Sequence, residues 1–245
     1  MMTPLVLVHG GGFDSRCWDL LVPHLTAPTI AVDLPGRGRR PGPLQSVTFA
    51  DCARAITADV DAAGFDEVVL VGHSLGGCSL PRAMALLRGR VRHAVFLAAM
   101  VPEAGTGTMH ELRPGVRDHV EASRAERRTT MDPARAKRYF GNDLGGAQFA
   151  WCLERLVPEA EGLTTEPVDL AGLRSPIPRT WVRTMRDAIL PPEMQARFAA
   201  RLGDCQMIDL DAGHMCMISQ PAALAKILHG IAGISDGASV RCEAF

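Results

Sequence analysis

The sequence has no long uninterrupted run of apolar residues. Hydrophobic residues make up 47% of its 245 positions, but each apolar segment is soon broken by glycine, proline or a charged side chain. A helix that crosses a bilayer needs about 20 apolar residues, so we expect no membrane span. The apolar stretch Leu5–Val8 is too short for a signal peptide and no basic residue precedes it, which favours a cytoplasmic protein.

The sequence also lacks an excess of charge of either sign. It has 26 Lys and Arg residues against 27 Asp and Glu residues, for a formal net charge of -1. Attraction to nucleic acids or anionic membranes is favoured by a basic field over the protein surface. We therefore expect neither as a partner and look for a small-molecule substrate instead. A homodimer is compatible with this composition.

Cysteine pairs at metal-binding or redox spacing are absent as well. The seven cysteines are scattered, with no CxxC pair and no Cys/His spacing of the zinc type. We interpret them as free thiols with a packing role, and we expect neither a metal nor an organic cofactor. A thiol nucleophile is the alternative interpretation.

Short aliphatic and β-branched runs alternate with longer segments of helical pattern. Such alternation is typical of a parallel sheet covered by helices on both faces. Parallel strands need long crossover connections, so the segments between them should be mostly helical. The predicted strands span residues 5–8, 29–32, 68–71, 94–98, 180–184 and 207–210.

The connection between the second and third predicted strands carries clear helix signals. Thr48 with Asp51 can cap the start of a helix, apolar side chains recur at helical spacing from Phe49 to Val60, and Gly64 can end it. We therefore predict a helix here.

The rhythm changes between residues 103 and 178, where strand-like runs disappear and charged helical stretches alternate with Gly and Pro. This pattern predicts a helical cap inserted after the fourth strand. The cap would lie over the carboxyl ends of the strands, where open α/β sheets bind ligands. The core would then consist of residues 1–102 and 179–245.

The sharpest motif follows the third predicted strand. Gly72-His73-Ser74-Leu75-Gly76 is a G-x-S-x-G sequence between a strand and a helical pattern, which is the context of a nucleophile elbow. The glycines leave room where the turn is too tight for side chains. We predict Ser74 as a nucleophile, although the same letters also occur in ordinary loops.

A second motif, His9-Gly10-Gly11-Gly12, ends the first predicted strand. Its glycines allow backbone N–H groups to approach a ligand, although a flexible turn would look the same. Together with the elbow, it predicts an oxyanion hole formed by the N–H groups of Leu75 and Gly11.

A serine nucleophile needs a base, and hydrolases of this kind place their triad in the chain order Ser, acid, His. His214 follows the last predicted strand on a loop. His229 lies in a helical pattern, and His110 and His119 lie in the cap. We therefore predict His214 as the base.

The acid should lie between Ser74 and His214, just past a strand, where it can orient the imidazole. Asp187 follows the fifth predicted strand and fits this position. The rivals are weaker candidates, because Asp209 lies within a strand run and Asp211 is only three residues before His214. Asp204 is a further rival.

These motifs together resemble a group within the α/β-hydrolase superfamily, the plant methylesterases and hydroxynitrile lyases with their bacterial relatives. The resemblance covers nearly the whole chain and is strong in the core motifs. Its anchors are residues 6–11 with Trp18, then 33–36, 72–77, 96–99, 187–195 and 213–215. The cap matches only loosely, through residues 139–143 and 156–159. The resemblance implies an α/β-hydrolase fold, with triad and oxyanion positions that agree with those predicted above.

The resemblance also separates two chemistries. Cyanide-releasing members carry Thr where this chain has Gly10, and Lys directly after the catalytic His, where it has Met215. Both lyase markers are absent, so hydrolysis is expected.

We therefore predict a serine hydrolase that cleaves a carboxylic ester of a small or medium-sized substrate through an acyl-enzyme. A thioesterase, a lyase or cyclase of natural-product metabolism on the same fold, and a non-catalytic small-molecule receptor are alternatives. Core packing would explain the candidate pocket residues equally well. These candidates are Phe13, Met100, Tyr139, Phe149, Trp151, Met215 and Met217.

Overall fold

The computed structural model describes residues 2–125 and 131–233, and its centre is a single sheet of six parallel strands. The spatial order is β2-β1-β3-β4-β5-β6. The strands are β1 (Leu5–Val8), β2 (Thr29–Val32), β3 (Val68–His73), β4 (Val91–Leu97), β5 (Arg179–Thr184) and β6 (Gln206–Leu210). The predicted fold class is confirmed.

The strand predictions differ most from the structure at β4, which begins at Val91 rather than at residue 94. The reason is a polar residue inside the strand. His93 can be buried in β4 because its ring nitrogen Nε2 forms a hydrogen bond with Thr180 Oγ1 on β5, at 2.9 Å. A histidine satisfied by a neighbouring strand has no signature in a hydropathy pattern.

The strand order reverses next to β1, since β2 lies on one side of it and β3 on the other. Ligands bind in the crevice that such a reversal opens beyond the carboxyl ends of the strands. The register pairs Val8, the last residue of β1, with Gly72 of β3. The loop from His9 and the turn at Ser74 therefore leave the sheet side by side.

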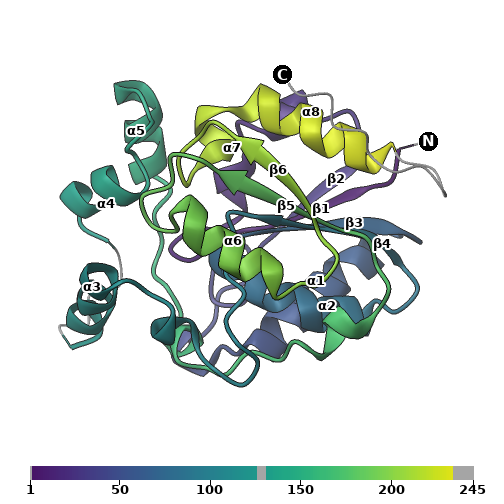
Figure 1. Ribbon diagram of the computed structural model, residues 1–245, viewed down its shortest axis with the longest axis horizontal. Coiled ribbons are helices and arrows are strands. Elements are labelled where there is room, and N and C mark those ends of the chain that lie inside the picture. The colour runs from purple at the N-terminus through teal and green to yellow at the C-terminus, as the bar shows by residue number, and fades with distance from the viewer. Residues whose placement is uncertain (1, 126–130, 234–245) are drawn as a thin grey trace.

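Helices cover both faces of the sheet (Figure 1), which explains why every residue of β1 and β3 is buried. One apolar cluster packs α1 (Phe49–Ala62), α2 (Leu80–Leu86) and α6 (Pro192–Ala200) on one face. A second cluster packs α7 (Cys216–Ser219) and α8 (Pro221–Ala232) on the other. Each large apolar side chain that is fully buried contributes about 1.5–3 kcal/mol to folding.

The predicted first helix is confirmed as α1. Thr48 and Asp51 form a reciprocal capping box at its start. Gly64, which follows it, has a φ of 65°, in the left-handed region that favours glycine.

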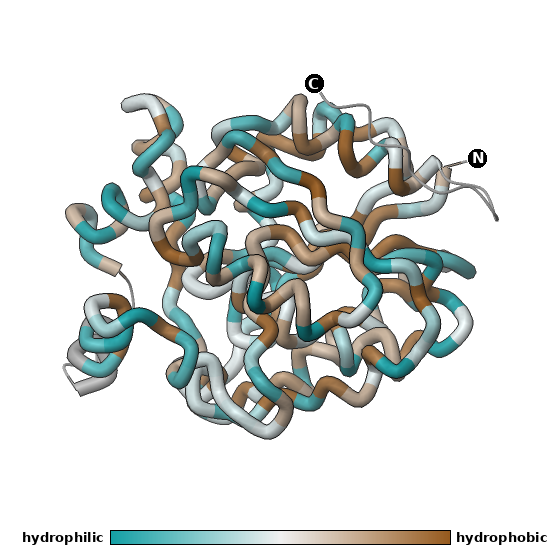
Figure 2. The backbone as a smooth tube through the Cα atoms, viewed as in Figure 1, coloured by the Kyte–Doolittle hydropathy of each residue, from teal (hydrophilic) through white to brown (hydrophobic). Residues whose placement is uncertain are grey.

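The described residues of the cap form three helices. These helices lie on the left of Figure 1, beyond the carboxyl ends of the strands. They are α3 (Pro114–Ala125), α4 (Pro133–Tyr139) and α5 (Gly146–Leu153). Figure 2 shows hydrophilic stretches on these outlying helices, whereas the central strands are mainly hydrophobic. None of the described helices is long and apolar enough to cross a bilayer.

The last part of the cap does not lie over the strand ends. Residues 161–174, with two short 3-10 turns, return along the core helices. The Glu166 carboxylate accepts a hydrogen bond from the Phe49 N–H at the start of α1, at 2.9 Å. Gly172 is pressed against α2, because a Cβ there would lie 1.7 Å from the Pro81 carbonyl oxygen. This stretch therefore serves as the crossover from β4 to β5.

Candidate active site

Ser74 lies in the sharp turn between β3 and the 3-10 turn Ser74–Ser79. Its φ of 52° is in the left-handed region, which residues with a side chain rarely adopt. The turn requires glycine on both sides. A Cβ at Gly72 would lie 2.4 Å from Leu80 Cδ1, and one at Gly76 would lie 2.4 Å from the His9 carbonyl oxygen. Ser74 alone in this turn is partly exposed, while its neighbours are buried.

The structure brings Ser74, His214 and Asp187 into one hydrogen-bonded chain. His214 Nε2 lies 2.9 Å from Ser74 Oγ, and His214 Nδ1 lies 2.7 Å from Asp187 Oδ2. The buried carboxylate can only accept, so a neutral His214 carries its proton on Nδ1 and leaves Nε2 to accept the Ser74 proton. This is the arrangement in which a serine hydroxyl becomes a nucleophile.

The Asp187 carboxylate is held from several sides. Oδ1 accepts the N–H groups of Ile189 and Leu190, both at 2.8 Å, and Oδ2 also accepts the Thr184 hydroxyl at 2.9 Å. These donors fix the carboxylate in the orientation that His214 needs.

Gln195 of α6 supports this loop from beneath and was not among the predicted site residues. It is fully buried, and its Nε2 donates to the carbonyl oxygens of Thr184 and Leu190, at 3.1 and 2.6 Å. Its Oε1 accepts the Thr184 N–H and the Trp181 indole N–H, each at 3.2 Å. A glutamine in an amphipathic helix gives no sequence signal that its side chain is buried.

The rival residues lie elsewhere. Asp209 is paired with Arg183 at 2.8 Å and Asp211 with Arg186 at 2.8 Å, and both aspartates are largely exposed. The side chain of His229 contacts Thr26 at the surface.

The loop after β1 packs directly on the nucleophile turn. A Cβ at Gly10 would lie 2.7 Å from Ser74 Cβ, and one at Gly11 would lie 3.3 Å from Leu75 Cδ2. The two glycines therefore let this loop lie against Ser74 and the side chain of Leu75, beside the place where a developing oxyanion would lie.

His9 fixes the orientation of this loop. Its Nε2 accepts the Leu34 N–H at 3.1 Å, so the proton is on Nδ1, which donates to the Gly10 carbonyl at 2.8 Å. A trans peptide group directs its C=O and N–H in opposite directions. The bond that orients the Gly10 carbonyl therefore also orients the Gly11 N–H. Burial lowers the pKa of His9 to about 4, so the ring stays neutral near pH 7.

The cap reaches the same loop through Glu159. Its carboxylate accepts the Gly12 N–H at 2.7 Å and forms an ion pair with Arg37, whose side chain is only 1% exposed. The Val157 N–H also donates to the Gly12 carbonyl at 2.9 Å. The end of the loop after β1 is therefore anchored by residues almost 150 positions later in the sequence.

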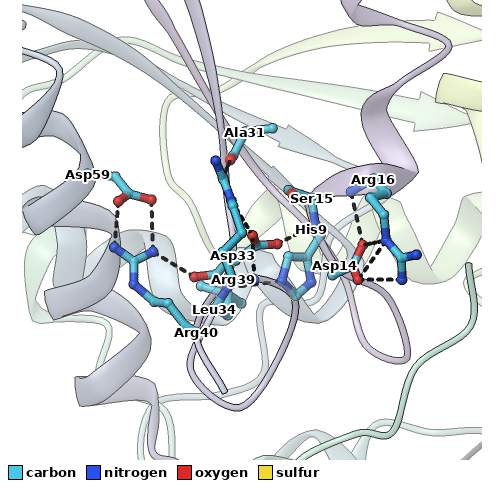
Figure 3. Close-up of polar contacts among 10 residues, drawn as sticks. All are labelled: His9, Asp14, Ser15, Arg16, Ala31, Asp33, Leu34, Arg39, Arg40 and Asp59. Carbon is cyan, nitrogen blue, oxygen red and sulfur yellow. Dashed lines mark hydrogen bonds and ion pairs between the residues drawn. The ribbon is translucent and has the colours of Figure 1, made fainter. Parts of the chain in front are cut away.

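A network of arginines and aspartates lies behind this loop (Figure 3). Asp33 accepts the Ser15 N–H at 2.8 Å and the Arg39 Nε–H at 2.8 Å. Burial would raise the pKa of Asp33, but the hydrogen bonds from Arg39 and Ser15 outweigh it and lower that pKa to about 2. A cavity of about 630 Å³ lies here between residues 14–16, 36–39 and 157–158, and the triad does not line it.

The predicted pocket residues separate into two groups. Phe13 and Met215 are fully buried near the triad, and Met100, 5% exposed, donates its N–H to the Ser74 carbonyl at 2.9 Å. The Phe13 ring contacts Phe140, which was not among the predicted pocket residues and whose ring stacks with its centroid 5.9 Å from that of His214.

The second group consists of cap aromatics that contact other cap residues. The Trp151 ring lies 3.6 Å from the Arg155 guanidinium, and the Phe149 ring lies 4.7 Å from the Lys137 ammonium. Tyr139 is 7% exposed beside Arg138. A substrate contact for these aromatics and for the buried Met217 stays a prediction.

The described cysteines have few features of a nucleophile. Burial raises the pKa of Cys52 and Cys152 to about 12 and that of Cys205 to about 11. The thiolate is the reactive form, so these thiols are inert near pH 7. Cys242 lies outside the described residues.

The fold and the residues at its strand ends are those of an α/β hydrolase. The chain matches the alpha/beta hydrolase family over residues 5–227 and belongs to it. The family resemblance predicted from the motifs is confirmed.

Two relatives are similar along nearly the whole chain. The probable esterase PIR7A of Oryza sativa subsp. indica is 30% identical over 261 residues, which cover 94% of this chain and 97% of that protein. Norfluorocurarine synthase 1 of Strychnos nux-vomica is 28% identical over 251 residues, which cover 93% and 94%. An extracellular alpha/beta-hydrolase from a Paenibacillus species shares the fold, with a TM-score of 0.82 at 20% identity over 92% of this chain and 97% of that one.

Proposed function

We propose that this protein is a serine hydrolase that cleaves carboxylic esters, with Ser74 as nucleophile, His214 as general base and Asp187 as the acid that orients it. One observation carries the proposal, the hydrogen-bonded chain from Asp187 to His214 at 2.7 Å and from His214 to Ser74 at 2.9 Å. The similarity to a probable esterase supports the choice of reaction.

In the proposed reaction, Ser74 Oγ attacks the ester carbonyl carbon while His214 Nε2 takes the hydroxyl proton. The N–H groups of Leu75 and Gly11 stabilise the oxyanion, each by about 3 kcal/mol. The intermediate collapses to an acyl-enzyme as the alcohol leaves with the proton from His214. A water molecule activated by His214 then releases the acid.

The surroundings of the triad favour ester cleavage over cyanide release. A leaving cyanide needs a positive group near the catalytic His to stabilise its charge. Met215 follows His214 directly, is fully buried and carries no charge. Gly10 offers no hydroxyl to bind a cyanohydrin. Ser74 leaves no room for a side chain there, because a Cβ at Gly10 would lie 2.7 Å from Ser74 Cβ.

The test is a comparison of the wild-type protein with Ser74→Ala. The wild type should hydrolyse methyl and p-nitrophenyl esters, while Ser74→Ala should keep its fold and lose this activity. Thioesters and mandelonitrile in the same panel separate the thioesterase and lyase alternatives. A fluorophosphonate should label Ser74; an adduct on a cysteine would instead support the thiol nucleophile.

A further inference from the structure

The loops that carry Asp187 and His214 leave the sheet side by side, because they follow the neighbouring strands β5 and β6. Two backbone hydrogen bonds continue the strand ladder into them. Met185 N–H donates to the Leu210 carbonyl at 3.0 Å, and Arg186 N–H donates to the Ala212 carbonyl at 2.9 Å. Beyond this last bond one loop turns toward α6 and the other toward α7. The acid and the base therefore lie just past the end of the ladder.

Two consecutive cap residues bind the loops at this point. Asn142 Nδ2 donates to the carbonyl of Arg186, the residue before Asp187, at 2.7 Å. Asp143 Oδ2 accepts the N–H of Gly213, the residue before His214, at 2.6 Å. The cap thus supplies a donor and an acceptor to the two backbone groups that follow the last hydrogen bond between the loops.

Gly213 shows how closely these side chains approach. A Cβ at this position would lie 2.4 Å from Asp143 Oδ1 and 2.8 Å from Asn142 Oδ1. Both distances are shorter than real Cβ contacts, so a side chain at residue 213 would displace both cap residues. The absence of a side chain directly before His214 is therefore what admits this pair.

We propose that Asn142 and Asp143 are positioning residues, whose side chains hold the acid loop and the base loop at the separation that the Asp187–His214 hydrogen bond requires. The proposal rests on the catalytic roles assigned to Asp187 and His214 above. Both cap residues act through the two loops and take no part in bond making. A mutation away from the reacting atoms that displaces a catalytic group by about 1 Å can lower the rate of the reaction by about 100-fold.

The experiment compares four variants of the full chain. Asp143→Ala removes the acceptor, Asp143→Asn keeps a carbonyl oxygen in its place, and Asn142→Ala removes the donor. Gln148→Ala is the matched control. It removes another hydrogen bond between cap and core, from Gln148 Nε2 to the Ile218 carbonyl at 3.0 Å, and the bond from the Gly145 N–H to Gln148 Oε1 at 3.1 Å. Neither bond involves a residue of the two catalytic loops. We would measure kcat and KM for p-nitrophenyl acetate as a function of pH, and the rate at which a fluorophosphonate labels Ser74.

We expect Asp143→Ala to lower kcat by about 10-fold to 100-fold, with KM changed less than about twofold. Asn142→Ala should act in the same direction but less, because Asn142 is exposed. Asp143→Asn should keep most of the activity, and Gln148→Ala all of it. A weaker bond to Asp187 stabilises the imidazolium less, so the acid limb of the pH–rate profile should move to lower pH in Asp143→Ala.

The proposal is wrong if Asp143→Ala keeps its kcat and its acid limb, or if Gln148→Ala loses as much activity. If Asp143→Ala does not fold, Asn142→Ala decides, because loss of an exposed donor should still slow Ser74 labelling. A wild-type protein that hydrolyses no ester would refute the proposed function alone. The labelling rates would still compare the variants, so the two failures are distinguishable.

Discussion

Two loops flank the pair formed by Ser74 and His214, one against each residue, and they are held in different ways. The acid loop, residues 184–190, is fixed mainly by neutral hydrogen bonds from its own vicinity, above all from the buried Gln195 eleven residues after Thr184. The oxyanion loop, residues 9–12, is fixed by distant groups. The backbone amide of Leu34, in the loop after β2, donates to His9, and the Glu159 carboxylate, which is paired with the buried Arg37, accepts the Gly12 N–H.

The difference matters because charged and neutral contacts respond to different changes in the protein. A buried ion pair is sensitive to the loss of either partner, since the remaining charge is left unpaired in the interior. A neutral hydrogen-bond network is sensitive to shape but not to charge. The oxyanion loop should therefore respond to pH and to changes in the cap, and the acid loop to changes in packing.

The largest expected effect is on the acid loop itself. Asp187→Asn should lower kcat by about 10⁴-fold, as loss of the orienting carboxylate does in other serine triads. Asp209→Asn is the control, because this aspartate only pairs with Arg183 at the surface. Steady-state kinetics on one ester would measure both. Equal losses in the two variants would contradict the assignment of the acid.

The second-largest effect should come from the loss of Gln195, which packs beneath the acid loop. Gln195→Leu would leave the Trp181 indole N–H and the backbone groups of Thr184 and Leu190 without partners. Each unsatisfied buried group costs about 1–3 kcal/mol, so we expect the free energy of unfolding to fall by about 3 kcal/mol or more. Urea denaturation measures the change. A stability within error of the wild type would show that the acid loop does not depend on this residue.

The oxyanion loop should reveal its dependence on charge in Glu159→Gln. The amide can still accept the Gly12 N–H, but Arg37 loses its counter-ion while buried. Breaking a buried ion pair costs about 3 kcal/mol, with a fall in kcat because the oxyanion loop loosens. The double variant Arg37→Met with Glu159→Gln should recover part of this stability. A double variant less stable than the single one would argue against the charge explanation.

The smallest effect concerns pH. The His9 pKa of about 4 lies below its ordinary value of 6.5, because burial excludes the charged form. Below pH 6.5 the unfolded chain binds a proton at His9 that the folded chain excludes, so stability falls as the pH falls toward 4. At about 1.4 kcal/mol per pKa unit, His9 should contribute about 2 kcal/mol of this loss between about pH 7 and pH 5.

The measurement is the free energy of unfolding of wild type and His9→Asn at both pH values. His93→Asn is the control, because burial lowers the pKa of His93 to about 4 as well, but on β4 and away from the loop. Both variants should show a flatter pH dependence of stability, and only His9→Asn should lower kcat near pH 7. An unchanged slope in His9→Asn would mean that His9 binds its proton in the folded state.

The same comparison explains what the sequence could predict. The elbow, the glycine loop and the chain order of the triad are local patterns, and they located Ser74, His214 and Asp187 where the structure joins them by hydrogen bonds. The supports were not predictable in this way. Gln195 looks like an exposed helix residue, and Glu159 and Asp143 act on backbone groups more than 65 residues away. Only the folded cap brings Glu159 and Asp143 to the loops, and only the packing of α6 buries Gln195 beneath one of them.

The route of the cap has a consequence for exchanging parts between members of this family. Its chain leaves β4 at the carboxyl end of the sheet and enters β5 at the opposite end, and residues 161–174 cover the core helices on the way. A graft cut at residues 102 and 178 would therefore remove part of the wall of the core along with the lid. A graft cut just before Pro114 and again near Ala160 would transfer α3, α4 and α5 with Asn142, Asp143 and Glu159. It would keep that wall intact, because Gly105 and Thr106, which form backbone hydrogen bonds with Val168, would stay with the core. Recombinants made at the second pair of sites should fold far more often.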